Sequence, residues 1–381
     1  MTTVLWLVVI LLVAVHLVSI TMFLRRLSGP EPQGVIGKPP VTLLRPVCGL
    51  DDFDEETLRS SFHQDWPEVH VIFCAATEGD RAVPLVRRLI SDHPHVKACL
   101  LIGDERISGN PKLNNLVKGW AAAQTEYICM TDSNLLLPVD YLTRLAAAWG
   151  PDTGLVSSPA IGTRPGNLAG ALECALLNSN QARLQFAADS LGMGFAQGKT
   201  LFWRRNLLER AGGLHVLGLR LAEDVAATRA IRGLGLRVSL PRLPFAQPIG
   251  NRSLRGVWDR QLRWSKVRRE GVPLVFLAEW LNGPAVPFLL AALGGGWPAL
   301  ILLALLWYGS EVLLMRRAGW PAGWRDIAAL PLRDLMLPAI FVATFARRGF
   351  EWRGTAMGTQ TGTRTGTRTG TVADPLAGPK A

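Results

Sequence analysis

The sequence predicts a membrane-anchored α/β protein, in which apolar helices precede and follow one large domain with a mostly parallel sheet. Three observations predict this fold class. An apolar run fills residues 4–24, strand-like and helix-like stretches alternate over residues 41–241, and apolar segments return after residue 269. Alternating strands and helices favour a parallel sheet, and apolar runs of about 20 residues can cross a bilayer.

Composition and charge also favour a membrane protein. The chain has 381 residues, 49% of them hydrophobic, and a formal net charge of +11. Arginine pairs stand beside the apolar runs, at Arg25–Arg26, Arg268–Arg269, Arg316–Arg317 and Arg347–Arg348. This placement is typical of a membrane surface, and the lack of a zinc-finger or RNA-binding motif argues against nucleic acid as a partner. Five scattered cysteines without CxxC spacing argue against a disulfide framework and fit a reducing cytosol.

The N-terminal apolar run, Val4–Leu24, predicts a transmembrane anchor over residues 1–27. A cleaved signal peptide carries its positive charge before the apolar run, whereas Arg25–Arg26 follow the run here. This order indicates a signal anchor whose C-terminal side lies in the cytosol. Residues 28–40 are rich in Gly and Pro and form the expected linker to the next domain.

Residues 41–269 form the predicted catalytic domain. The expected strands are Val41–Leu44, Val69–Ala75, Ala98–Ile102, Tyr127–Thr131, Leu155–Ser158, Gln197–Trp203 and Leu236–Pro241. The expected helices are Asp54–Phe62, Pro84–Ser91, Leu113–Ala123, Tyr141–Trp149 and Ala222–Gly233. Because ligands bind at the carboxyl ends of parallel strands, the residues that follow these strands are the candidates for a site.

Residues 270–350 turn apolar again and are expected to form C-terminal membrane helices. The segments are Pro273–Leu293, Trp297–Met315 and Ile327–Phe345. The first and the last of them contain polar or charged residues, so the alternative to a true span is a re-entrant or interfacial helix. Residues 351–381 contain a Thr/Gly/Arg repeat of low complexity, which predicts a disordered tail.

The strongest local motif is Thr131–Asn134, because it follows an expected strand directly. Asp132 in this motif can hold a divalent metal that bridges the two phosphates of a nucleotide-sugar. The alternative is an Asx turn that merely ends the strand. Glu78 and Asp80 follow the expected strand Val69–Ala75 in the same manner, so two strands deliver carboxylates to one edge of the sheet.

Asp224 is the candidate general base, since it stands in the sequence Ala222-Glu223-Asp224 at the expected start of a helix. A positioned carboxylate can remove a proton from an acceptor hydroxyl, although the helix dipole by itself also favours acidic residues there. Lys112, near another helix start, is a candidate phosphate contact. The alternative for Lys112 is an ordinary polar helix start.

Arg260, Arg263 and Trp264 stand just before the apolar C-terminal third of the chain. The two arginines are three residues apart on one helix face. Paired arginines can hold a pyrophosphate leaving group, and a tryptophan can wall a sugar or lipid pocket. The alternative is a basic and aromatic belt beside the membrane. The sequence lacks the GxGxxG fingerprint, which argues against dinucleotide binding.

Taken together and in this order, these pieces resemble the ceramide glucosyltransferase family, a branch of the inverting GT-A glycosyltransferases. The resemblance covers roughly residues 41–269, with the anchor and the C-terminal membrane helices also matching. The family pattern has three aspartate motifs followed by (Q/R)xxRW, which are matched in order by Asp80, Asp132, Asp224 and the group Arg260, Arg263 and Trp264. Leu44–Gly49 and Asn110–Leu116 resemble further stretches of the family.

The resemblance implies a GT-A-like, Rossmann-type nucleotide-sugar domain and a role for each motif. Asp80 is expected at the uridine of the donor, Asp132 at Mg²⁺ or Mn²⁺ and the diphosphate, and Asp224 as the base. The remaining expected donor-site residues are Glu78, Lys112, Arg260, Arg263 and Trp264. The last three would also stand at the entrance for the acceptor.

The implied reaction transfers one sugar, expected to be glucose, from a UDP-sugar to the primary hydroxyl of ceramide, with inversion. It would take place on the cytosolic face of a bacterial inner membrane. Two stretches depart from the family pattern. Ala76-Thr77 stands where family members often carry another acidic or polar residue, and Asn178–Gln181 lies where animal members carry a His-Pro pair. The alternatives are a hopanoid-lipid glycosyltransferase, a processive polysaccharide synthase and a non-catalytic membrane scaffold.

Overall fold

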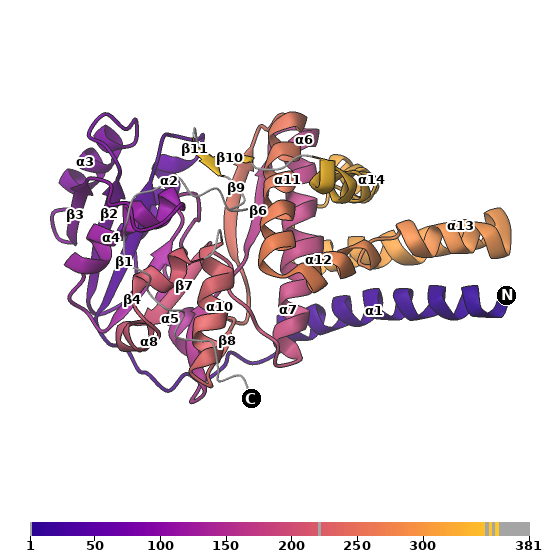
Figure 1. The fold of residues 1–381 in the computed structure, drawn as a ribbon, viewed down its shortest axis with the longest axis horizontal. Helices are drawn as coiled ribbons and strands as arrows, with labels where there is room; N and C mark the ends of the chain where they lie inside the picture. Colours follow the sequence, from indigo (N-terminus) through magenta and orange to yellow (C-terminus); the bar gives the residue numbers. More distant parts are fainter. Residues whose placement is uncertain (1, 220–221, 347–349, 353–354, 358–381) are drawn as a thin grey trace, which may run out of the picture.

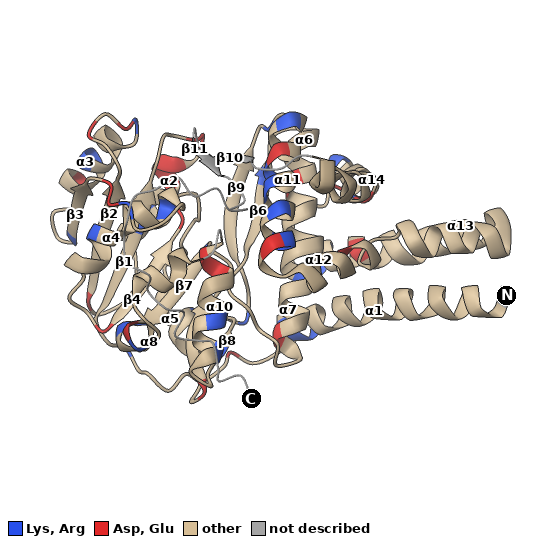
Figure 2. Cartoon of the chain, viewed as in Figure 1, with Lys and Arg blue, Asp and Glu red and all other residues tan. Residues whose placement is uncertain are grey.

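The structure is a computed structural model that describes residues 2–219, 222–346, 350–352 and 355–357. A layered α/β domain fills one half of Figure 1. Helices α1 (Thr2–Ser28) and α13 (Ala285–Arg317) project together from its other side and form a membrane arm. Figure 2 shows that charged residues are spread over the layered domain and are nearly absent from the outer part of the arm.

The domain is built on a seven-stranded sheet with the order β3-β2-β1-β4-β7-β5-β8. The strands are β1 Val41–Val47, β2 Val69–Ala75, β3 Lys97–Ile102, β4 Tyr127–Thr131, β5 Thr153–Ser157, β7 Thr200–Arg204 and β8 Arg237–Ser239. Only β7 runs antiparallel to its neighbours among these described strands, so the predicted mostly parallel sheet is confirmed.

Helices cover both faces of this sheet. They are α2 Asp54–Arg59, η1 Ser60–Phe62, α3 Val83–Asp92, α4 Pro111–Ala122, α5 Tyr141–Ala147, α8 Arg205–Arg210, α9 Leu214–Gly218 and α10 Glu223–Gly233. Successive side chains of a strand point to opposite faces. Leu43 therefore packs in one apolar layer with Val86 of α3, and Leu44 packs in the other with Leu116 of α4.

A second unit joins the sheet to the membrane helices. It contains the parallel pair β6 (Ala160–Pro165) and β9 (Phe245–Gly250) and helix α11 (Leu254–Gly271). It also contains one continuous helical segment, made of α6 (Leu168–Ala175), the π-helix η2 (Leu176–Ala182) and α7 (Arg183–Ser190). The sequence analysis missed β6, β9 and the helical segment, because they lack a clean apolar period.

The membrane arm contains a helical hairpin. After α12 (Pro273–Ala278) and η3 (Glu279–Leu281), helix α13 is interrupted at Gly296, whose φ of 63° and ψ of −159° are not helical. The chain reverses there, because the ring centroids of Phe288 and Tyr308, on the two sides of Gly296, lie only 6.2 Å apart. The segments expected at 273–293 and 297–315 are thus the outgoing and returning parts of one hairpin.

Three segments are long and apolar enough to cross a membrane: Thr3–Ser28, Pro273–Arg317, which contains the hairpin, and α14 (Trp324–Ala346). This finding supports a membrane-associated protein. Trp6 of α1 packs against the hairpin turn, so the N-terminal end of α1 and the turn share the tip of the arm. Short strands β10 (Phe350–Trp352) and β11 (Thr355–Met357) follow α14, and the expected disordered repeat lies outside the described residues.

Candidate active site

Asp132 lies at the carboxyl end of β4, in the middle of the sheet, where two lysines hold it. Lys112 Nζ is 2.6 Å from Asp132 Oδ1, and Lys199 Nζ is 3.1 Å from Asp132 Oδ2. Burial alone would raise the pKa of Asp132, but these two ammonium groups keep the pKa well below its ordinary value. Asp132 therefore stays ionised at neutral pH, in a half-buried position.

Lys112 joins three segments of the site. Asn110 caps α4 by accepting from the backbone N–H groups of Lys112 and Leu113, and this cap fixes the first turn that carries Lys112. From there, Lys112 Nζ reaches Glu223 Oε1 at 3.0 Å and donates to the carbonyl of Gly198 at 2.6 Å. Its positive charge is thus shared between carboxylates from β4 and α10.

Asp224 occupies the first turn of α10, directly after Glu223. Its side chain accepts hydrogen bonds from the backbone N–H groups of Val225 at 2.7 Å and Gly198 at 3.3 Å. Burial, followed by the neighbouring Glu223 carboxylate, raises the pKa of Asp224 to about 6. A carboxylate with a raised pKa is suited to accept a proton near neutral pH.

This raised pKa predicts an acid limb in the pH profile. Asp224 acts as a base only when ionised, so kcat/KM should fall as the pH drops below about 6, as the carboxylate becomes protonated. Replacing Glu223 by Gln removes a neighbouring negative charge and should move the limb to lower pH. Initial rates measured from pH 4.5 to 8 check this. A limb that stays in place in the Glu223→Gln variant would rule out this electrostatic coupling.

Asp80 ties the loop after β2 to the loop after β1. Its carboxylate accepts from the backbone N–H of Gly49 at 2.9 and 3.1 Å and from that of Ala82 at 2.8 Å. A cavity of about 500 Å³ opens beside these loops. Residues of both loops and of α3 line it, among them Leu50, Asp51, Arg81, Leu85 and Arg88.

Glu78 points elsewhere. It forms an exposed ion pair with Arg87 of α3 at 2.5 Å. Among the contacts that the structure describes, none joins Glu78 to Asp132 or Asp224, so the fold does not bring Glu78 into the cluster.

Arg260, Arg263 and Trp264 all lie on α11, within the second unit. Arg260 forms an ion pair with Glu173 of α6, a carboxylate that is almost fully buried. Trp264 packs against the apolar cluster that contains Leu177 and Ile249.

Arg252 extends this ion pair toward the donor-side cavity. It lies 3.4 Å from Glu173 and pairs with Asp51 at 2.7 Å. Asp51 in turn lines the cavity beside Asp80. The arginines of α11 and of its preceding loop are thereby connected to the loop that follows β1.

Three residues of the site escaped the sequence analysis. Lys199 lies within the expected strand at residues 197–203, and Glu223 stands in the sequence Ala222-Glu223-Asp224, but neither was assigned a role. Arg45 is the one charged residue in strand β1, and this was the feature of the sequence that could have identified it. It is fully buried and donates to the carbonyls of Thr57, Ser133 and Leu135, at 2.9, 3.0 and 3.1 Å. It thereby fixes the turn that carries Asp132.

The donor set around Lys112 is suited to a cation. Asp132, Glu223 and the carbonyl of Gly198 direct three oxygens at one ammonium nitrogen, and oxygen ligands are those that Mg²⁺ and Mn²⁺ prefer. In the described part of the chain, no three His, Cys, Asp or Glu side chains gather to hold a metal by themselves. A divalent ion at Asp132 would therefore need further oxygens, such as those of a diphosphate.

Comparison with known proteins identifies the family. The model of "Glycosyl transferase family 21" matches residues 4–365. The chain belongs to this family. Its membership confirms the resemblance noted in the sequence. The family match spans the anchor, the layered domain and the C-terminal membrane helices together.

Two curated relatives are ceramide glucosyltransferases of Caenorhabditis elegans. Ceramide glucosyltransferase 1 is 26% identical over 284 residues, which cover 74% of this chain and 60% of the relative. Ceramide glucosyltransferase 3 is 26% identical over 331 residues, covering 83% and 72%. This family 21 chain thus spans about 60% of the length of the first relative.

A solved structure confirms the GT-A-like fold of this family 21 chain. A mannosyltransferase from Pyrobaculum calidifontis, solved in complex with GDP-Man and Mn²⁺, superposes with a TM-score of 0.52 at 21% sequence identity. The similarity covers 87% of this chain and 99% of the mannosyltransferase.

Proposed function

We propose that the protein is a membrane hexosyltransferase that moves one sugar, expected to be glucose, from a UDP-sugar to the primary hydroxyl of ceramide. One observation carries the proposal. A single ammonium group, that of Lys112, joins Asp132 at the end of β4 to Glu223, and the adjacent Asp224 has a raised pKa. A cation-holding carboxylate beside a proton-accepting one is what inverting sugar transfer requires.

The donor would bind along the carboxyl edge of the sheet. The uridine would lie in the cavity beside Asp80, between the loops that follow β1 and β2. Asp132 would hold Mg²⁺ or Mn²⁺, which neutralises charge on the diphosphate of the leaving UDP. Lys112 and Lys199 stand next to this carboxylate and would turn their ammonium groups to the phosphate oxygens.

The acceptor would approach Asp224 from the membrane side. The Asp224 carboxylate takes the proton of the acceptor hydroxyl, and the hydroxyl oxygen attacks the anomeric carbon of the sugar. The bond from that carbon to the UDP oxygen breaks in the same step, so the configuration inverts. Arg260, Arg263 and Trp264 would steady the donor phosphates and border the acceptor entrance.

Ceramide is the proposed acceptor because the curated relatives are named ceramide glucosyltransferases and the match to them extends over most of this chain. We infer a cytosolic catalytic domain from the arginines that follow the apolar run of α1. We propose a bacterial inner membrane from the Arg- and Ala-rich composition of the chain. Both the donor and a membrane lipid would be accessible there.

The role of Asp132 leads to a binding prediction. The Asp132→Ala variant should bind UDP in the presence of Mn²⁺ with an affinity reduced by more than about tenfold. Loss of a residue that only supports a metal ligand already lowers metal affinity by about that factor, and Asp132 is the proposed ligand itself. Titration calorimetry with and without Mn²⁺ measures this. Asp140→Ala, which removes a partly exposed carboxylate paired with Arg144, is the matched control. Unchanged Mn²⁺-dependent affinity in Asp132→Ala would refute the metal role.

The proposed function is tested with membranes that express the chain, a panel of labelled UDP-sugars, and ceramide or a polyol hopanoid as acceptor. A glycolipid with one sugar, formed from ceramide and lost on chelation, is the expected product. Product from the hopanoid alone would show that the acceptor is a hopanoid and not ceramide. A long polymer would indicate a polysaccharide synthase. A non-catalytic scaffold would give no product with any pair of substrates.

A further inference from the structure

Helix α14 is long and apolar enough to cross a membrane, but it runs differently from the membrane arm. In Figure 1, α1 and α13 lie side by side across the picture, whereas α14 is seen nearly along its axis. Helix α14 therefore crosses the direction of the arm.

The N-terminal end of α14 lies at the base of the arm. Trp320, in the turn before α14, packs edge-on against Phe23 near the C-terminal end of α1, with ring centroids 5.1 Å apart. Ala329 and Leu330 are buried in the same apolar cluster as Leu172 of α6. This end of α14 is thus held where the arm meets the second unit.

The C-terminal end of α14 is held by α11 and α12. Thr344 Oγ1 and Ser265 Oγ of α11 are 2.8 Å apart, and Arg269 donates to the carbonyl of Thr344 at 2.8 Å. The ring of Phe341 stacks on that of Phe276 in α12, at 4.8 Å between centroids. The last turns of α14 therefore lie where the chain leaves the second unit for the membrane arm.

Both ends of α14 consequently lie on the side of the layered domain. Its 23 residues would extend about 34 Å, roughly the thickness of a hydrocarbon core. A spanning α14 would bring its last turn to the tip of the arm, beside Trp6 and the hairpin turn. Among the contacts described, that turn is joined to Ser265 and Arg269 instead.

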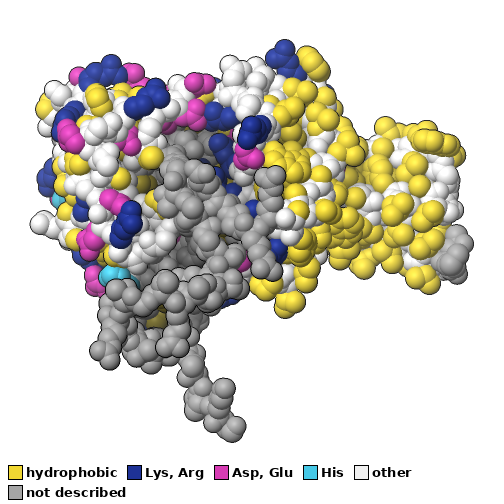
Figure 3. Space-filling view, turned by 45° about the horizontal axis from the view of Figure 1, so that its top comes forward, with side chains coloured by type: hydrophobic (Ala, Val, Ile, Leu, Met, Phe, Trp, Pro, Cys, Tyr) yellow, Lys and Arg dark blue, Asp and Glu magenta, His cyan; other side chains and the backbone are white. Residues whose placement is uncertain are grey.

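The outer face of α14 is an apolar stripe. It contains Leu332, Leu335, Val342 and Phe345, of which the last three are 75%, 63% and 55% exposed. Their spacing places them along one side of the helix. In Figure 3, apolar side chains cover the arm and continue onto the adjoining face of the molecule. Acyl chains are the partner that suits a surface continuous with a membrane arm.

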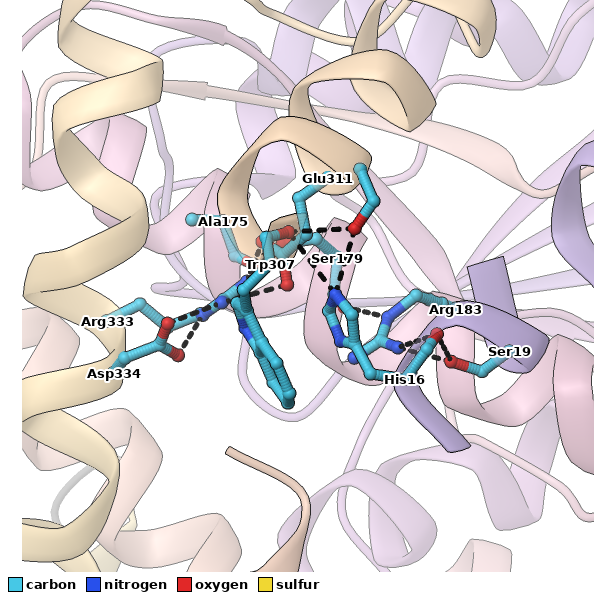
Figure 4. A network of polar contacts seen from close by, with 10 residues as sticks. His16, Ser19, Ala175, Ser179, Arg183, Trp307, Glu311, Arg333 and Asp334 are labelled. Carbon is cyan, nitrogen blue, oxygen red and sulfur yellow. Dashed lines mark hydrogen bonds and ion pairs between the residues drawn. The ribbon is translucent and has the colours of Figure 1, made fainter. Parts of the chain in front are cut away.

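The inner face of α14 is charged and buried, as Figure 4 shows. Arg333 pairs with Glu311 of α13 at 2.9 and 3.1 Å and with Asp334 at 2.8 and 2.9 Å. It also donates to the hydroxyl of Ser179 in the π-helix. Arg333 and Asp334 face the protein, whereas the apolar stripe faces outward. From Leu332 onward, α14 therefore has the polarity of a helix immersed in lipid along one side.

We propose that α14 lies in the plane of the membrane, with its apolar stripe among the acyl chains of the leaflet next to the layered domain. Both ends of the helix then remain on the side of that domain. The partner of the stripe is lipid, and the buried ion pairs fix the rotation of the helix about its axis. The proposal is independent of the proposed function.

Cysteine labelling in intact cells tests this arrangement. A full-length variant without its native cysteines carries Trp324→Cys at the start of α14 or Ala346→Cys at its end. A membrane-impermeant maleimide is added before or after permeabilisation. Thr3→Cys, at the tip end of α1, is the matched control for the opposite side of the membrane. Melting temperatures in detergent select variants that remain folded.

The expected result is that Trp324→Cys and Ala346→Cys behave alike and oppositely to Thr3→Cys. Labelling of Ala346→Cys together with Thr3→Cys, while Trp324→Cys stays protected, would overturn the proposal and make α14 a span. A reporter fused after Ala381 gives an independent measurement in the full chain. A green fluorescent protein fusion that fluoresces supports the proposal, and an alkaline phosphatase fusion that is active contradicts it.

Discussion

Asp224→Asn is expected to reduce kcat by about 10²–10⁴-fold, the usual cost of losing a positioned base. The amide keeps the shape of the side chain, and its one oxygen can still accept the 2.7 Å hydrogen bond from Val225, whereas the 3.3 Å hydrogen bond from Gly198 is lost. It cannot take up the proton of the acceptor hydroxyl. UDP binding in the presence of Mn²⁺ should therefore stay near that of the wild type. Steady-state rates and calorimetry on the same preparation measure the two effects.

Asp152→Asn is the matched control for this variant, because Asp152 is an exposed aspartate paired with Arg237, outside the site. It should keep wild-type activity. Turnover of Asp224→Asn at the rate of this control would exclude Asp224 as the base. A loss of UDP binding equal to the loss of rate would indicate a structural role instead.

Arg333→Met is expected to destabilise the protein by about 3–5 kcal/mol, which is typical when one partner of a buried ion pair is removed. Methionine fills a similar volume but leaves the carboxylates of Glu311 and Asp334 buried without their cation. The ion pairs connect α13, α14 and the π-helix (Figure 4), so their loss should loosen the arm from the domain. Denaturant or thermal unfolding in detergent measures the change.

The control is Arg204→Met, which breaks an exposed ion pair with Glu126 and should cost no more than about 1 kcal/mol. A combined variant, in which Arg333, Glu311 and Asp334 all become apolar residues of similar volume, should recover much of the lost stability. Equal melting temperatures for Arg333→Met and Arg204→Met would show that the buried network contributes little.

The sheet could be predicted because its strands are apolar runs separated by turn residues, and Val69–Ala75 and Tyr127–Thr131 were predicted with the bounds they have in the structure. The rule that parallel strands share a ligand-binding edge also singled out Asp132 directly. This rule could not identify Lys199, because Lys199 precedes the antiparallel strand β7. Only the folded structure shows which strands β7 pairs with.

Other features depend on tertiary contacts that no local pattern encodes. Arg45 is a buried charge stabilised by carbonyls from two distant segments. The sequence predicted a break between Leu293 and Trp297, but not that the chain reverses direction at Gly296. The direction of α14 likewise follows from contacts with α11 and α6, which lie far away in the sequence.

The hairpin of α13 also has a consequence for biogenesis. Its outgoing helix covers residues 285–295, which at 1.5 Å per residue reach about 16 Å, half of a hydrocarbon core. Such a segment is too short to be held in the bilayer by itself during synthesis. Insertion must wait until residues 297–317 have left the ribosome, so the two helices enter the membrane together, alongside an α1 that is already in place.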